Sequence, residues 1–408
     1  MDKSMAEQDT IPAASSSFPA DELTNAFVAF LFSASAPVAI ILSAGVKGGL
    51  SQATLASWIF AAFVLNGILT IVMSAIYRQP LAFLWTIPGA VLVASALQHL
   101  PFAEVIGAYL LTAALMLVLG LTGWVGAIMD RIPMPIVMGM VAGVFLSFAL
   151  DWIKSFATDP WLAGAMTVTF FAVSIFPAIQ KRLSPIIGAL IAGVCVLVFM
   201  GRAPVLEHVT LATSLASPQF YAPVFSWGAT FELVLPLAVT VIAVQNAQGI
   251  AVLRNSLHRP PVNAITNACG VFSALTACLG CVSTCLAGPS NAIIASGANA
   301  SRHWIAAIFL GVMVIVFGLF SPLVTQALLA TPAAFVATLA GLALLRILQG
   351  AFHTAFRQHF TLGALVAFLV TLGGLPLLGI GAPFWGVVFG VATSFILERA
   401  DFAKQGKN

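Results

Sequence analysis

Two apolar segments, one in each half of the chain, are broken by proline and glycine at matching places. The first reads Leu-Trp-Thr-Ile-Pro-Gly-Ala over residues 84–90, and the second reads Leu-Ala-Gly-Pro-Ser-Asn over residues 286–291. Each motif predicts an extended stretch followed by a short helix that begins inside the membrane. Such a helix start leaves unpaired backbone N–H groups and a positive dipole end, which attract an anion. Paired broken segments of this kind indicate the binding site of a membrane transporter.

Composition places the chain in a lipid bilayer. Of its 408 residues, 61% are apolar and only 7% are charged, whereas soluble domains carry about 25% charged residues. A membrane span needs about 20 apolar residues. Fourteen segments qualify, counting the two broken ones: 23–44, 55–76, 84–98, 103–126, 133–150, 161–179, 184–200, 228–252, 262–281, 288–298, 302–322, 333–350, 360–375 and 383–398. The sequence therefore predicts an all-α polytopic membrane protein with 14 transmembrane segments.

The placement of Lys and Arg tests this count of spans. With the N-terminus inside, thirteen of these residues fall on the cytoplasmic side, and three (Lys47, Lys154 and Arg202) fall outside. This distribution agrees with the positive-inside rule, and an odd number of spans would scramble it. We therefore expect both termini to lie in the cytoplasm.

The longest outside loop divides the chain into two halves of seven spans. Residues 202–226 form this extracytoplasmic loop, between a first repeat at 23–201 and a second repeat at 227–400. Because seven is odd, the second repeat must cross the membrane in the opposite sense, with a broken segment third in each half. Residues 1–22 are polar and acidic and do not resemble a cleavable signal peptide. We expect them to form a disordered cytoplasmic tail, and 401–408 to form a second cytoplasmic tail.

The broken segments supply the first candidate binding residues. Those at the two motifs are Thr86, Ile87, Pro88, Gly89, Ala90, Gly288, Pro289, Ser290 and Asn291. Ordinary proline kinks and helix–helix hydrogen bonds are the alternative explanation. The recurrence of the pattern in both halves favours a substrate site.

Three amides in the eighth span supply further candidates. Gln245, Asn246 and Gln248 fall within four residues of a bilayer segment, where unsatisfied amides are costly. Gln245 and Gln248 share one helix face, and Asn246 lies about 100° round the helix. One amide could serve as interhelical glue, but the cluster favours a polar cavity. Ser33 and Ser35 are the weaker counterparts in the first span.

Two ionisable residues inside predicted spans have alternative roles. Glu232, near the outer start of the eighth span, is either a proton carrier or an interfacial acid at a helix N-terminus. Arg346 in the twelfth span either pairs with an acid or extends to the cytoplasm along its own helix, and we favour the second.

Other motifs point to packing rather than chemistry. The spacing of Cys278, Cys281 and Cys285 could place three thiols on one helical face, but no His or acid lies nearby in sequence, so we expect no metal or other cofactor. The motifs Gly139-x-x-x-Gly143 and Gly386-x-x-x-Gly390 predict close helix packing, within or between protomers. No nucleophile–base constellation is visible, so we expect no enzymatic activity. Nothing indicates a nucleic-acid partner.

Several stretches resemble the bacterial benzoate/proton symporters of the BenE type. The clearest are Trp85-Thr86-Ile87-Pro88-Gly89-Ala90, Gln245-Asn246-Ala247-Gln248-Gly249 and Gly379-Ile380-Gly381-Ala382-Pro383-Phe384-Trp385-Gly386. The resemblance implies the inverted-repeat fold of uracil permeases and sulfate-permease-like carriers. Spans 1–4 and 8–11 would then form a core domain, and spans 5–7 and 12–14 a gate domain, with a short strand before each half-helix. In the uracil permease branch, acids of the eighth and tenth spans bind and couple, whereas this chain has amides there.

The resemblance also implies the function. It predicts import of benzoate or a related aromatic carboxylate in symport with protons, by alternating access, in the bacterial inner membrane. Phe32 would belong to an apolar wall for the ring, and a homodimer is plausible because many relatives are dimers. A carrier of another small anion or of a nucleobase, and a passive anion channel, remain as alternatives.

Overall fold

A computed structural model describes residues 20–125, 133–176, 183–203, 210–297, 299–374, 377–378 and 380–405. The expected N-terminal tail lies outside this part of the chain, except that its last three residues are helical. Parts of the expected outside loop (204–209) and of the C-terminal tail (406–408) also lie outside it.

The first half of the chain follows the predicted order of spans. Its elements are α1 (Ala20–Ala34), α2 (Ala36–Lys47), α3 (Gln52–Phe60), η1 (Ala61–Leu65), α4 (Asn66–Tyr77), β1 (Phe83–Trp85), α5 (Ile87–Ala96), α6 (Phe102–Thr122), α8 (Met134–Thr158), α9 (Pro160–Ile175) and α11 (Pro185–Phe199). The first span bends at Ser35 (φ −95°, ψ −93°). Pro37 explains the bend, because its ring cannot pack against the carbonyl four residues earlier.

The second half repeats this order. Its elements are α12 (Leu211–Ser214), α13 (Trp227–Ala229), η2 (Thr230–Val234), α14 (Leu235–Val239), η3 (Thr240–Asn246), α15 (Ala247–Asn255), α16 (Val262–Ala277), β2 (Thr284–Leu286), α17 (Gly288–Ile294), η4 (Ala300–Arg302), α18 (His303–Leu319), α19 (Ser321–Leu329), α20 (Ala333–Phe356), α21 (Thr361–Gly373), α22 (Ala382–Leu397) and α23 (Arg399–Gln405). Short helices α12, α19 and α23 were not predicted. Within the described residues, seven helical stretches are long and apolar enough to cross a membrane, and the other spans are shorter.

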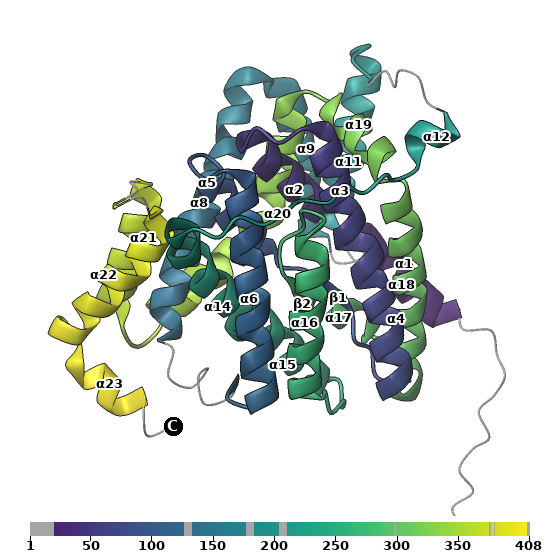
Figure 1. Cartoon of the computed structure of the whole chain (residues 1–408). Coiled ribbons are helices and arrows are strands. Elements are labelled where there is room, and N and C mark those ends of the chain that lie inside the picture. The colour runs from purple at the N-terminus through teal and green to yellow at the C-terminus, as the bar shows by residue number, and fades with distance from the viewer. Residues whose placement is uncertain are drawn as a thin grey trace, which may run out of the picture.

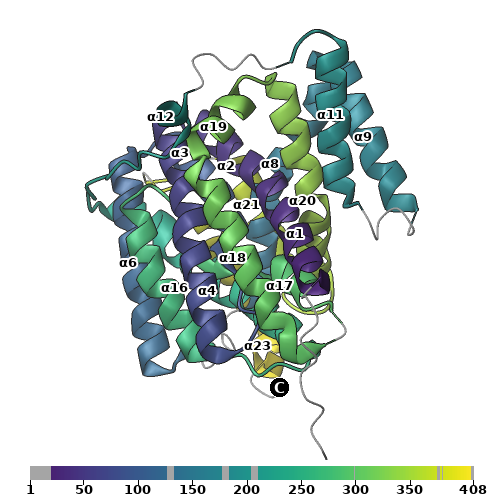
Figure 2. The same ribbon diagram turned by 90° about the vertical axis from the view of Figure 1, so that its right-hand side faces the viewer.

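The helices form two bundles (Figures 1 and 2). In the first, the core bundle, α6 packs along α16, and α18 packs along both α1 and α4. In the second, the gate bundle, α8 packs along α20 and α21, α21 along α22, and α9 along α11. This is the inverted-repeat core-and-gate fold that the sequence predicted.

A two-stranded sheet lies inside the core bundle and joins the two halves. Strands β1 and β2 are antiparallel, with Phe83 opposite Leu286 and Trp85 opposite Thr284. Antiparallel pairing directs the helices that follow, α5 and α17, in opposite directions. In Figure 1, α5 lies above the strands and α17 beside their lower end. The prediction of a strand plus a half-helix in each broken segment is therefore confirmed.

The two small-residue motifs pack within one chain. A Cβ on Gly139 would lie 2.3 Å from the carbonyl oxygen of Ala364, and one on Gly386 would lie 2.7 Å from that of Ala367. Both carbonyls belong to α21, which α8 and α22 therefore approach at backbone distance. The close packing predicted from the motifs is confirmed, and both motifs use the same partner helix.

The cysteines depart from the expected arrangement. Helix α16 ends at Ala277, so Cys278 and Cys281 lie in the turn before β2, and Cys285 lies in β2 itself. The three cysteines therefore do not share the helical face that their spacing would have allowed, because the chain becomes extended there. Among the described residues, no group of three or more His, Cys, Asp or Glu is arranged to hold a metal ion.

Candidate functional site

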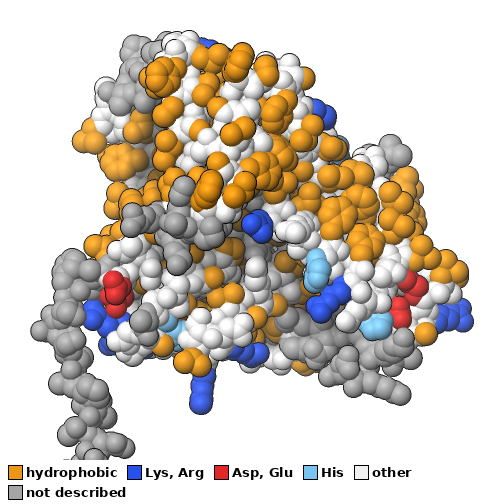
Figure 3. All heavy atoms as spheres, turned by 180° about the vertical axis from the view of Figure 1, so that it is seen from behind, with side chains coloured by type: hydrophobic (Ala, Val, Ile, Leu, Met, Phe, Trp, Pro, Cys, Tyr) orange, Lys and Arg blue, Asp and Glu red, His pale blue; other side chains and the backbone are white. Residues whose placement is uncertain are grey.

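A cavity of about 630 Å³ lies between the core bundle and the gate bundle. Its walls come from α1, α2, α5, η3, α15 and α17 on the core side, and from α8, α9, α11 and α20 on the gate side. It reaches the first residues of α8 and α11 and the last turn of α20, at Met134, Ser184 and Thr354. These helix ends face the lower side in Figure 1, to which α23 also belongs. We call this the terminal side, and the opposite side the loop side. Figure 3 shows a hollow in the middle of one face of the molecule. Charged side chains gather on the lower part of this face.

The start of α5 forms part of the cavity wall. Ile87 and Pro88 line the cavity. The Thr86 hydroxyl caps the helix by accepting a hydrogen bond from the Gly89 N–H at 3.2 Å. Gly89 and Ala90 are buried in the helix behind this first turn. Of these five predicted residues, the structure therefore places two at the surface of the cavity and three in support of it.

The start of α17 meets the same cavity from the other repeat. Pro289 lines the cavity, as Pro88 of the first broken segment does. Ser290 and Ser33 lie with their hydroxyl oxygens 3.1 Å apart. Both serines line a smaller cavity of about 20 Å³ next to the half-helix starts. Gly288 leaves room for the Gln248 side chain, whose Cγ would lie 2.9 Å from an added Cβ. The two broken segments therefore converge, as the sequence predicted.

Two of the predicted residues support the broken segments instead of lining the cavity. Asn291 Oδ1 accepts the Ala82 N–H at 3.0 Å, and its Nδ2 donates to the Ala82 and Ala287 carbonyls at 3.1 and 2.7 Å. Asn246 Oδ1 accepts the Leu286 N–H at 2.8 Å. Both side chains are buried and absent from the cavity wall. The structure therefore places both side chains in support of the broken segments, where extended backbone inside a membrane needs internal hydrogen-bond partners.

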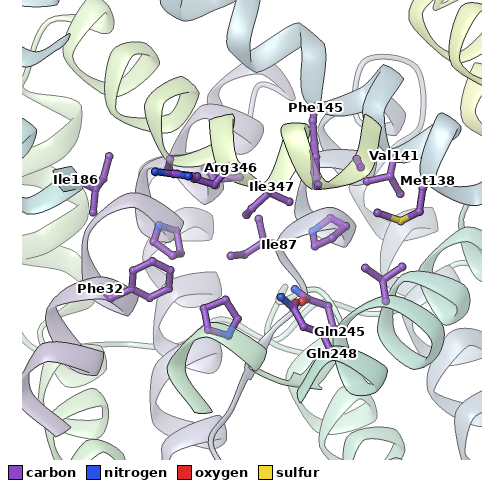
Figure 4. Close-up of a pocket in the computed structure, with 18 of the residues that line it drawn as sticks. Phe32, Ile87, Met138, Val141, Phe145, Ile186, Gln245, Gln248, Arg346 and Ile347 are labelled. Carbon is purple, nitrogen blue, oxygen red and sulfur yellow. The ribbon is translucent and has the colours of Figure 1, made fainter. Parts of the chain in front are cut away.

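The two glutamines of the same helical span, unlike the two asparagines, line the cavity. Gln245 and Gln248 both line the cavity, and both are labelled in Figure 4. Gln245 is only 7% exposed, yet neither amide has a hydrogen-bond partner among the described residues. A buried amide without a partner is costly unless water or a ligand satisfies it. Gln245 lies in the π-helical stretch η3, a distortion that is frequent at functional sites.

The first span contributes Phe32 and the bend at Ser35. Phe32 lines both cavities, as expected for an apolar wall. The Ser35 hydroxyl donates to the Phe32 carbonyl at 3.1 Å and does not line either cavity. Ser35 therefore supports the bend that places Phe32.

Arg346 is a cavity residue that the sequence analysis assigned elsewhere. It lines the cavity from α20 and lies across it from Gln245 and Gln248 in Figure 4. The expectation that it extends to the cytoplasm along its own helix is corrected by this placement. A lone arginine within an apolar span was the signal, since intramembrane ionisable residues mark functional sites by default.

Glu232 lies away from the cavity, at the loop side of the molecule. It is 2% exposed, and its Oε2 lies 2.9 Å from the His99 ring Nε2. The same oxygen accepts the Gly381 N–H at 2.8 Å. His99 follows α5 of the core bundle, and Gly381 precedes α22 of the gate bundle. No sequence motif had singled out His99.

Known proteins match most of the chain. The family model described as "Benzoate membrane transport protein" (BenE) matches residues 16–396. An inner membrane protein of Escherichia coli, YdcO, is 32% identical and covers 94% of this chain and 97% of its own length. A benzoate membrane transport protein of Acinetobacter baylyi is 30% identical, and the match covers 91% of this chain and 94% of that protein.

Solved structures show the same fold at low identity. The transmembrane domain of the cyanobacterial bicarbonate transporter BicA has a TM-score of 0.61 and 15% identity, with 91% of this chain and 97% of that chain covered. Murine Slc26a9, an anion transporter in the inward-facing state, has a TM-score of 0.66 and 12% identity. The match covers 94% of this chain and 69% of that chain. In another SLC26A9 structure, this chain covers 64% of the longer protein. The sequence matches and the shared membrane-transporter fold agree, and the chain belongs to the BenE family of benzoate membrane transport proteins.

Proposed function

We propose that this chain imports benzoate or a closely related aromatic carboxylate together with protons, by alternating access. The observation that carries the proposal is the cavity between the two bundles. It is mainly apolar, it contains two amides without hydrogen-bond partners among the described residues, and it is reached by the start of each half-helix. Apolar pockets with a few convergent polar groups are typical of small-molecule sites.

The apolar walls suit an aromatic ring. Phe32 lies on the core side, and Phe145 and Phe170 lie on the gate side. A cavity of about 150 Å³ is enough to hold benzene. The cavity here is about 630 Å³, so a ring with its carboxylate and some water fits inside it.

The polar groups of the core bundle suit the carboxylate. Gln245 and Gln248 each offer an Nε2–H donor in the cavity, and the first turn of α5 presents the positive end of a helix dipole at Ile87 and Pro88. The convergence of two oppositely directed half-helices is the arrangement by which secondary transporters hold a substrate at mid-membrane.

The contacts at the two sides support alternating access. The cavity reaches the terminal side, while Glu232, His99 and Gly381 hold the two bundles together at the loop side. We assign the terminal side to the cytoplasm from the positive-inside rule, which makes this conformation inward-facing. Movement of the core bundle against the gate bundle would break the loop-side contacts and expose the cavity to the outside.

The proton has two candidate routes in this proposal. Glu232 can carry it, in contact with the half-exposed His99 ring at the loop side. Alternatively, the substrate carboxyl itself binds the proton, because removal from water favours the neutral form of a carboxylate.

Uptake by proteoliposomes tests the proposal. Purified protein is reconstituted, and uptake of labelled benzoate is followed after an inward-directed pH step, with empty liposomes as the control for diffusion of neutral benzoic acid. We expect saturable, pH-driven uptake that aromatic carboxylates inhibit and that uracil or acetate does not. Uptake no faster than in empty liposomes would overturn the proposal, as would selective transport of uracil. Conductance far above carrier turnover would indicate a channel.

A further inference from the structure

Arg346 lies near the middle of α20, away from both ends of this helix. It precedes the last residue of α20, Phe356, by ten residues, which is about 15 Å along a helix axis. An arginine side chain at this depth is costly in hydrocarbon. Its guanidinium nevertheless lines a cavity that water can enter, and the residue is exposed there.

The guanidinium has no counter-charge within the described part of the chain. Arg202 and Arg302, by contrast, pair with Asp159 and Glu22 at 2.7 and 2.8 Å. No Asp, Glu or Lys is present among the described residues that line the cavity. The described wall of the cavity therefore carries one positive charge, which a single anionic group would balance.

The position of Arg346 relative to the glutamines gives this charge a second use. Gln245 and Gln248 belong to the core bundle, whereas Arg346 belongs to α20 of the gate bundle (Figure 4). An anion between them would contact both bundles. A guanidinium presents its N–H groups as a planar fork that matches the two oxygens of a carboxylate.

We propose that Arg346 makes this site select aromatic monocarboxylates over neutral aromatic compounds of the same shape. It does so by pairing with the substrate carboxylate from the gate side, while the apolar walls hold the ring of either kind of compound. This inference rests on the proposed function, and it adds the residue that decides between a charged and an uncharged ligand.

The test compares benzoate with benzamide, which has the same ring and shape but no charge. Binding of each to purified full-length protein is measured at pH 7.5 by calorimetry, for the wild type, Arg346→Gln, Arg346→Lys and the control Arg357→Gln. Arg357 is an exposed arginine at the end of the same helix and outside the cavity.

We expect Arg346→Gln to weaken benzoate binding by about 10- to 100-fold, the range for loss of a hydrogen bond to a charged group. Benzamide binding should stay within about 3-fold, which also shows that the variant is folded. Arg346→Lys should retain more benzoate affinity than Arg346→Gln, because it keeps the charge and loses only the fork. Arg357→Gln should keep the wild-type preference.

Three outcomes would contradict the proposal, and they are distinguishable. If the wild type binds benzoate but Arg346→Gln keeps its preference over benzamide, the inference on Arg346 fails while the proposed function stands. Equal losses of benzoate binding in the Lys and Gln variants would indicate a packing role and would also overturn the inference. If the wild type binds no aromatic carboxylate, the proposed function fails and the inference fails with it.

Discussion

Glu232 Oε2 lies 2.9 Å from His99 Nε2, at the side of the protein opposite the mouth of the cavity. The same carboxylate oxygen accepts the Gly381 N–H at 2.8 Å. Because Gly381 immediately precedes α22 of the gate bundle and the other two residues belong to the core bundle, one buried carboxylate connects the two bundles. This contact closes the loop side in the conformation whose cavity reaches the terminal side.

Replacement of Glu232 by Gln should remove the response of uptake to a proton gradient. Each coupled proton allows about a 10-fold increase in benzoate accumulation per pH unit, since one unit is worth about 1.4 kcal/mol. Gln cannot release a proton, so accumulation in the variant should not rise with the imposed gradient. The measurement is steady-state accumulation in proteoliposomes at pH steps of zero, one and two units.

Glu104→Gln is the matched control for this experiment. Glu104 lies in the first turn of α6, which packs against η2, and its carboxylate accepts a hydrogen bond from the Ser226 hydroxyl. The control should accumulate benzoate as the wild type does. An unchanged response in Glu232→Gln would assign the proton to another group, such as the substrate carboxyl.

The neighbouring amides Gln245 and Asn246 should respond differently to alanine substitution. Asn246→Ala removes the acceptor of the buried Leu286 N–H, so we expect a loss of about 1–3 kcal/mol in stability. Gln245→Ala breaks no hydrogen bond within the described protein, and it should instead weaken benzoate binding about 10-fold, or 1.4 kcal/mol. Thermal unfolding in detergent and benzoate titration separate the two effects. The same change in both measurements for the two variants would contradict the separation of roles.

Asn291→Ala provides an independent check on the supporting role of the asparagines. Its side chain satisfies both backbone groups of Ala82 across the pair of broken segments. We expect the variant to unfold at a lower temperature than Gln245→Ala, because two buried backbone groups lose their partner. A stable variant with normal unfolding and no substrate binding would return Asn291 to the substrate site.

Close packing of α8 on α21 predicts a large difference between two glycine substitutions. In Gly139→Ala the new Cβ would lie 2.3 Å from the backbone carbonyl of Ala364, which cannot move without the helix. We expect a destabilisation of about 1–3 kcal/mol. Gly164, in α9, has nothing within 4 Å of an added Cβ, so Gly164→Ala should be neutral or stabilising by up to about 1 kcal/mol. Unfolding midpoints of the two variants test this; equal midpoints would mean that α8 and α21 do not approach this closely.

The loop between α15 and α16 should make stability depend on pH. Partial burial and the neighbouring His303 ring, 3.0 Å away, lower the pKa of His258 below its usual 6.5. In the unfolded chain His258 gains a proton near pH 6.5, whereas in the folded chain it does so only at lower pH. The unfolded state therefore binds more protons in that window, and the His258 contribution to stability is lost as the pH falls from about 6.5 toward the lowered value.

His258→Gln should flatten this part of the pH profile. Its unfolding midpoint should change less between pH 7.5 and pH 5.5 than that of the wild type. His353→Gln, at an exposed position on α20, is the control and should keep the wild-type slope. A wild-type slope in His258→Gln would assign the pH dependence to other groups.

The sequence alone predicted the fold to a large extent. Long apolar runs must span a bilayer, and a proline with glycine inside such a run must interrupt its helix, so the segments around Pro88 and Pro289 were identified from local physics. Helical periodicity placed Gln245 and Gln248 on one face and Asn246 on another, but the sequence analysis still assigned all three amides to the cavity.

The contacts across the chain were beyond the reach of sequence patterns. Nothing local indicates that Asn291 satisfies Ala82, which lies 209 residues earlier, or that His99 meets Glu232. Arg346 could be read as a residue that extends along its own helix until the cavity between the bundles was known. These assignments depend on which helices meet and how they are rotated about their axes.

The chain by itself determined that it spans a membrane as two repeats with broken third segments, because the cost of exposing backbone or charge to lipid acts residue by residue. The tertiary structure decided which polar side chains support the strands and which face the cavity. The reason is that the hydrogen-bond partners and counter-charges of a buried polar group come from distant parts of the chain. Those partners decide whether the group supports the backbone or faces the cavity.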